Sequence, residues 1–127
     1  MSTTVTILGQ KWPVSPPSGP NGFTAAEEWM EEVNTNREDS GLRIMGAAIG
    51  LTTSVMSDSG ITLEKSGYKI LRYGGEVYGY LRQKGASANE LLAAAPHCYK
   101  ALTSLTTPSK KEVEEKQDFT SGGEKPT

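Results

Sequence analysis

The stretch Lys69–Lys84, KILRYGGEVYGYLRQK, carries the clearest structural pattern in the sequence. On a helical wheel of about 100° per residue, apolar and glycine residues fill one arc and charged residues another. The first arc holds Ile70, Leu71, Tyr73, Gly74, Val77, Tyr78, Tyr80 and Leu81, and the second holds Lys69, Arg72, Glu76 and Arg82. This pattern predicts an amphipathic helix. Gly85 stands where a left-handed glycine commonly ends a helix.

A second helical pattern follows and predicts a helical hairpin around Gly85. Ser87 and Glu90, three positions apart, form the signature of a capping box at a helix start. Pro96 removes a hydrogen-bond donor, so we expect this helix to kink or restart before residues 97–105. Its inward side chains are expected to be Leu91, Leu92 and Ala95, followed after the proline by Tyr99, Leu102 and Leu105.

Two further helices are predicted upstream. Thr24 and Glu27 form another capping box, with Phe23 placed as a hydrophobic staple. The apolar stripe of this helix comprises Phe23, Ala26, Trp29, Met30 and Val33. The next helix, from Asp39 or Ser40 to Leu51, should bury Leu42, Met45, Ala48, Ile49 and Leu51. Its Gly46 and Gly50, four positions apart, would let another backbone approach closely.

The two ends of the chain differ from this helical body. Val5, Ile7, Trp12 and Val14 alternate around Gly9, which predicts a short β-hairpin. Residues 13–22, rich in Pro and Gly, are expected to form an extended connector. Residues 106–127 are charged and poor in apolar groups, so we expect a disordered tail. The predicted fold is mainly α, with about four helices in residues 23–105 behind a β-hairpin and connector in residues 1–22.

Composition and charge disfavour several classes of function. The 127 residues carry a formal net charge of -2, which argues against a nucleic-acid or anionic-membrane binder driven by bulk charge. The segment between Ala25 and Ser40 contains six acidic residues and one basic residue, which indicates an acidic helix surface. One Cys cannot form an internal disulfide or a Cys-based zinc site. We found no apolar run of transmembrane length and no signal-peptide pattern at the start.

The sequence contains no assembled catalytic or cofactor motif. His97 and Cys98 are the one pair that resembles a base and a nucleophile, but adjacent helical positions point about 100° apart. Arg72–Glu76, RYGGE, lacks the pattern of a phosphate-binding glycine loop. Glutamates at helical spacing could clamp a cation, although a solvated or partner-facing surface is the favoured interpretation. We therefore predict a protein that is not an enzyme and uses no cofactor or metal.

Aromatic and acidic side chains are the candidates for contact with another protein. All five tyrosines lie between Tyr68 and Tyr99. Tyrosine suits a surface that is buried against a partner and yet tolerable in water, although a role in the domain core is the favoured interpretation of the pattern and several tyrosines could serve both. The predicted partner-binding residues are Trp12, Trp29, Tyr73, Tyr78, Tyr80, Glu28 and Glu32.

Two segments carry a resemblance to a known family. Val5–Pro17, VTILGQKWPVSPP, with the connector and acidic helix after it, resembles the N-terminal pattern of tail assembly chaperones from long-tailed bacteriophages. Arg72–Ala95, RYGGEVYGYLRQKGASANELLAAA, is similar to segments of small phage morphogenesis proteins. The resemblance implies a non-enzymatic chaperone in the host cytoplasm that binds tail components, such as the tape measure or tube protein.

Other functions remain open at this stage. A structural head-tail connector, a minor tail protein and a small regulator that binds a host protein are alternatives within the binding class. A thiol-dependent hydrolase using Cys98 and His97 is an alternative from another class. Strand edges and tyrosines also make a homo-oligomer a reasonable expectation.

Overall fold

Helices make up most of the chain that the computed structural model describes, which comprises residues 3–35 and 41–106. The elements in chain order are β1 (Thr3–Ile7), β2 (Gln10–Val14), α1 (Gly19–Asn34), α2 (Gly41–Thr52), α3 (Ile70–Gln83) and α4 (Ala88–Thr106). The predicted helical fold with an N-terminal hairpin is confirmed. The predicted disordered tail lies outside the described residues, except for Thr106, which ends α4.

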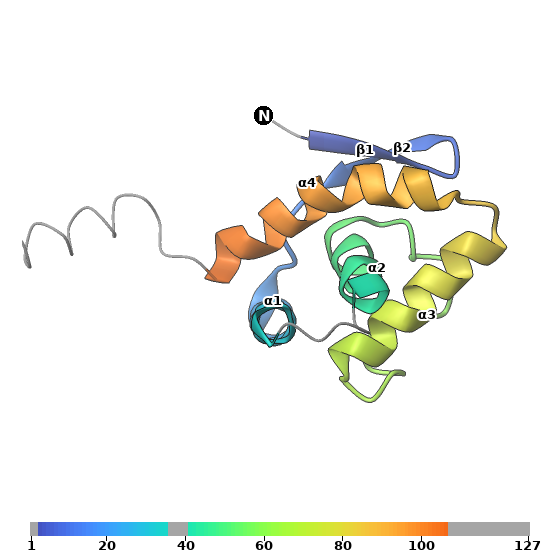
Figure 1. Ribbon diagram of the computed structural model, residues 1–127. Helices are drawn as coiled ribbons and strands as arrows, with labels where there is room; N and C mark the ends of the chain where they lie inside the picture. The colour runs from blue at the N-terminus through green and yellow to red at the C-terminus, as the bar shows by residue number, and fades with distance from the viewer. Residues whose placement is uncertain (1–2, 36–40, 107–127) are drawn as a thin grey trace, which may run out of the picture.

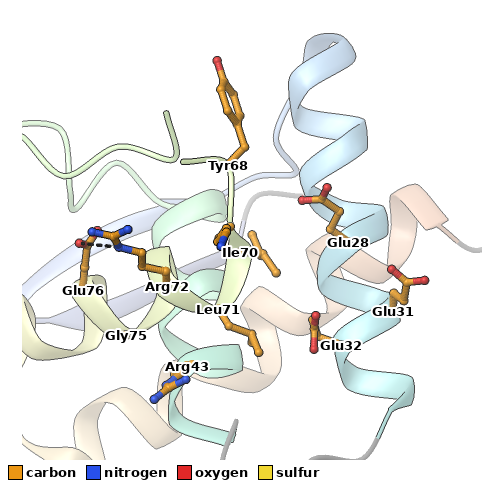
Figure 2. A pocket seen from close by; sticks show the side chains of 11 residues that line it. Glu28, Glu31, Glu32, Arg43, Tyr68, Ile70, Leu71, Arg72, Gly75 and Glu76 are labelled. Carbon is orange, nitrogen blue, oxygen red and sulfur yellow. Dashed lines mark ion pairs between the residues drawn. The ribbon is translucent and has the colours of Figure 1, made fainter. Parts of the chain in front are cut away.

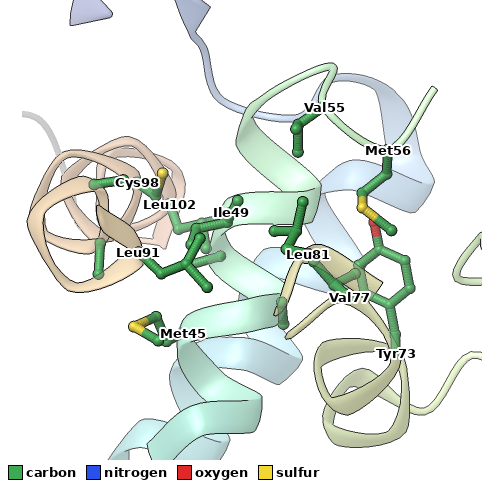
Figure 3. Packing of buried hydrophobic residues seen from close by; sticks show 14 of the residues in the cluster. Met45, Ile49, Val55, Met56, Tyr73, Val77, Leu81, Leu91, Cys98 and Leu102 are labelled. Carbon is green, nitrogen blue, oxygen red and sulfur yellow. The ribbon is translucent and has the colours of Figure 1, made fainter. Parts of the chain in front are cut away.

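Helix α2 lies at the centre of the fold and packs against the other three helices, while the hairpin packs on α4 (Figure 1). Side chains from α2, α3 and α4 interlock in the core (Figure 3). Fully buried members are Ile49, Val77, Leu81, Leu91, Cys98 and Leu102. None of the helices in the described part of the chain is long and apolar enough to cross a membrane.

Glycines bring the backbones of α2 and α3 into direct contact. A methyl group on Gly46 would overlap the carbonyl oxygen of Gly74, and a methyl group on Gly74 would overlap the carbonyl oxygen of Arg43. A methyl group on Gly50 would lie 2.9 Å from a methyl carbon of Val77. The close approach of another backbone is therefore confirmed at Gly46, whereas Gly50 instead accommodates the side chains of Tyr73 and Val77. The helix propensity lost at these glycines is offset by packing against the backbone of the neighbouring helix at Gly46 and Gly74, and against side chains at Gly50.

The start of α1 differs from the prediction. This helix begins at Gly19, inside the segment expected to be extended, with Ser18 as N-cap and Pro20 in its first turn. Proline suits this position because the first amides of a helix have no intrahelical acceptor. Thr24 is not a cap, since its hydroxyl donates to the Pro20 carbonyl within the helix (3.0 Å). Phe23 is 49% exposed, so it does not act as a staple.

Helix α4 also departs from the prediction. It runs unbroken through Pro96. Pro96 and Leu92 both lie on the exposed side, so water can bond the carbonyl that the proline leaves without a donor. Leu92 and, on α2, Leu42 were expected to be buried but are 57% and 52% exposed. Cys98, on the inner side of α4, is fully buried.

The hairpin is anchored to the N-terminus of α4. Leu8 and Gly9 form its turn with positive φ angles of 57° and 74°, which confirms the turn predicted at Gly9. The Glu90 amide donates to Ser87 Oγ (3.0 Å), as a cap requires. The Glu90 carboxylate, however, accepts a hydrogen bond from the Leu8 amide (3.0 Å), so it holds the hairpin turn instead of completing a capping box.

Candidate partner-binding groove

A groove of about 740 Å³ lies between α1 and the first turns of α3 (Figure 2). We call it the α1–α3 groove. The residues that line it are Glu28, Glu31, Glu32, Arg43, Tyr68, Lys69, Ile70, Leu71, Arg72, Gly75 and Glu76. Two of the predicted partner-binding residues, Glu28 and Glu32, are among them.

The wall formed by α1 is acidic. Glu28, Glu31 and Glu32 recur at helical spacing, and Glu28 and Glu32 extend toward α3 in Figure 2. Trp29 sets the orientation of α1, because it is buried in the core and its indole Nε1 donates to the Ile44 carbonyl on α2 (2.9 Å). This core contact therefore determines which face of α1 lines the groove.

The opposite wall is basic and has an apolar floor. Lys69 and Arg72 come from the start of α3 and Arg43 comes from α2. Arg72 Nε lies 3.8 Å from Glu76 Oε2, four positions along the helix. Ile70 is buried, and Leu71 is half-buried and points toward α1. The groove thus presents apolar surface between walls of opposite charge.

Tyr68 stands at the mouth of the groove in a strained backbone conformation. Its φ of 59° lies in the left-handed region, which is uncommon for a bulky residue. Its amide donates to the Leu63 carbonyl (2.9 Å). Two residues earlier, the fully buried Ser66 donates its hydroxyl to the Glu76 carboxylate. These bonds hold Tyr68 in place. The residue is 55% exposed and its ring projects outward (Figure 2).

The other predicted partner-binding residues lie elsewhere. Trp29 and Tyr73 are 2% and 4% exposed, so the structure corrects both from partner contacts to core residues. Burial raises the pKa of Tyr73 to about 12. Trp12 is half-buried, and its indole Nε1 donates to the Ile7 carbonyl within the hairpin (3.0 Å). Tyr78 and Tyr80 are half-buried on α3, outside the lining of this groove.

His97 and Cys98 do not face one another. Cys98 is fully buried, whereas His97 is exposed on the other side of α4. Burial raises the pKa of the Cys98 thiol, and a hydrogen bond with Thr52 offsets part of that rise. Within residues 3–35 and 41–106, no group of three or more His, Cys, Asp or Glu side chains could hold a metal ion.

Comparisons with protein-family models, curated proteins and solved structures found no match. The sequence did not reveal the basic wall of the groove. The pattern placed Lys69 and Arg72 on the solvent-exposed side of one helix, and Arg43 lies on another helix. The sequence signal that could have found Tyr68 is weak: it follows Gly67 and immediately precedes a helix.

Proposed function

We propose that this chain is a protein-binding factor that holds a segment of another polypeptide in the α1–α3 groove. The observation that carries this proposal is the pairing of an apolar floor with walls of opposite charge. Apolar surface supplies binding free energy, and the charged walls supply orientation and a fast association rate. The exposed Tyr68 at the mouth adds the kind of aromatic side chain that is enriched at protein interfaces.

The resemblance to tail assembly chaperones supports a more specific role. On this proposal the bound polypeptide is a phage tail component, such as the tape measure or tube protein, and binding takes place in the host cytoplasm. A chaperone must release its client when assembly proceeds. Contacts between solvent-exposed charges suit release, because each contributes little free energy and is weakened by salt.

An aggregation assay tests this function. A purified fragment of the tape measure protein is followed by light scattering, with and without this chain. We expect the wild type to suppress aggregation and the Glu28→Lys/Glu32→Lys variant to lose that effect. Glu27→Lys is the matched control, since Glu27 is an exposed glutamate of α1 that does not line the groove.

Two results would overturn the proposal. One is equal aggregation of the tape measure fragment with and without the wild-type chain. The other is the presence of this chain in purified virions at a fixed copy number, measured by mass spectrometry, because a chaperone leaves the particle whereas a connector or minor tail protein stays.

A further inference from the structure

A second hollow of about 700 Å³ lies among α2, α3 and α4, and we call it the α2–α4 hollow. Its lining is mostly apolar and comprises Gly41, Leu42, Arg43, Met45, Gly75, Tyr78, Leu92 and Tyr99. Leu42 and Leu92 are more than half exposed, although the helical periodicity of the sequence assigns both to core stripes. Side chains patterned for burial are thus left uncovered around one concave surface, which is typical of an interaction site.

The two hollows meet at Arg43 and Gly75, which line both. Gly75 is not required by packing within the fold, because a methyl group there would make only an ordinary contact with Arg43 Cγ (3.6 Å). A glycine inside a helix nevertheless costs about 1 kcal/mol relative to alanine. The missing side chain leaves a low point on α3 over which a partner could pass from one hollow to the other.

The charges that line the α1–α3 groove determine which end of a bound partner lies in it. Its lining carries four carboxylates against three cationic side chains, and three of those carboxylates stand together on α1. Arg72 already pairs with Glu76 on the opposite wall. The groove therefore favours basic side chains toward α1, whereas the α2–α4 hollow favours apolar ones.

We infer that one amphipathic helix of a partner polypeptide occupies both hollows. Its apolar side chains cover Leu42 and Leu92, its backbone crosses α3 at Gly75, and its basic residues face Glu28, Glu31 and Glu32. This inference rests on the proposed function and adds the chemistry of the client: a helix with an apolar stripe and a basic end. Helices that lay an apolar face into a groove are a recurring mode of peptide recognition.

Fluorescence anisotropy with two synthetic peptides tests the inference. Both peptides repeat Leu at helical spacing. In one half of the peptide, the first carries Lys beside the Leu stripe and the second carries Glu at the same positions. We expect the wild-type chain to bind the Lys peptide at least tenfold more tightly than the Glu peptide. Leu42→Ser/Leu92→Ser and Gly75→Leu should each weaken Lys-peptide binding at least tenfold, with circular dichroism confirming that the variants are folded.

Matched controls separate this site from general surface effects. Phe23→Ser removes an exposed apolar side chain that lines neither hollow, and Gly79→Leu adds a side chain on α3 where no atom lies within 4 Å. Neither substitution should change affinity for the Lys peptide. Equal losses in these controls and in the test variants would overturn the inference.

The remaining outcomes distinguish this inference from the proposed function. If Glu28→Lys/Glu32→Lys abolishes peptide binding but Leu42→Ser/Leu92→Ser does not, the partner occupies the α1–α3 groove alone and the inference fails. If neither peptide binds while the tape measure fragment is still protected, the inference again fails and the proposed function stands. If that protection is also absent, both fall.

Discussion

Gly74 and Gly75 are neighbours in α3, yet the first lies against the backbone of α2 and the second lines an open groove. Gly74 has no room for a methyl group, whereas Gly75 and Gly79 could each accept one. Glycine is therefore required by close packing on one face of α3 and is not required by packing on the other. One face fixes the fold, and the other is left accessible.

Replacing Gly74 should break the fixed face and give the largest effect. In Gly74→Ala the new methyl group overlaps the Arg43 carbonyl, and neither backbone can move away without separating α2 from α3. We expect a loss of about 3 kcal/mol or more in the free energy of unfolding, measured by urea denaturation. Gly75→Ala is the matched control and should retain or raise stability. Equal destabilisation by both substitutions would contradict the contrast between the two faces.

Alkaline pH should weaken the same fixed face through Tyr73, whose hydroxyl leaves no room for a methyl group on Gly50. Burial raises the pKa of Tyr73 from 10.0 to about 12 in the folded state, so ionisation favours the unfolded chain. Its contribution to stability is fully present below pH 10 and is lost as pH rises toward 12, by about 2–3 kcal/mol. Urea denaturation across this range should show a flatter profile for Tyr73→Phe, whereas Tyr68→Phe at the exposed mouth should follow the wild type.

Adding a methyl group on the accessible face should have the smallest effect on stability, and it should be a gain instead of a loss. Gly79→Ala adds a methyl group with no neighbour and improves helix propensity, so we expect a gain of about 1 kcal/mol. A rise in the thermal midpoint of unfolding, followed by circular dichroism, would show it. A fall would mean that the outer face of α3 is packed more closely than the structure shows.

The sequence predicted the elements of the fold better than their exposure. The wheel pattern anticipated α3, and the spacing of Gly46 and Gly50 anticipated a close approach to α2 but not that α3 would make it. Leu42 and Leu92 were assigned wrongly, because periodicity identifies an apolar stripe but not whether a neighbouring element covers all of it. The start of α1 was placed too late, because proline marks both an extended segment and the first turn of a helix.

The candidate groove was only half visible in the sequence. Glu28 and Glu32 share one helix, so their spacing alone places them on one face. Lys69, Arg72 and Arg43 join them only through the packing of three helices, which no local pattern records. Trp29 and Tyr73 were overvalued as partner contacts, because aromatic side chains serve cores and interfaces equally well.

The hydrogen bond from Leu8 to Glu90 spans 82 positions, and it sets the order in which the chain can fold during synthesis. The ribosome makes β1 and β2 before α4, but a two-stranded ribbon is marginally stable by itself and needs α4 as its support. The N-terminal hairpin must therefore wait for α4. A nascent chain that stalls before α4 would expose Val5 and Ile7, so synthesis of α4 is a condition for shielding the apolar face of the hairpin.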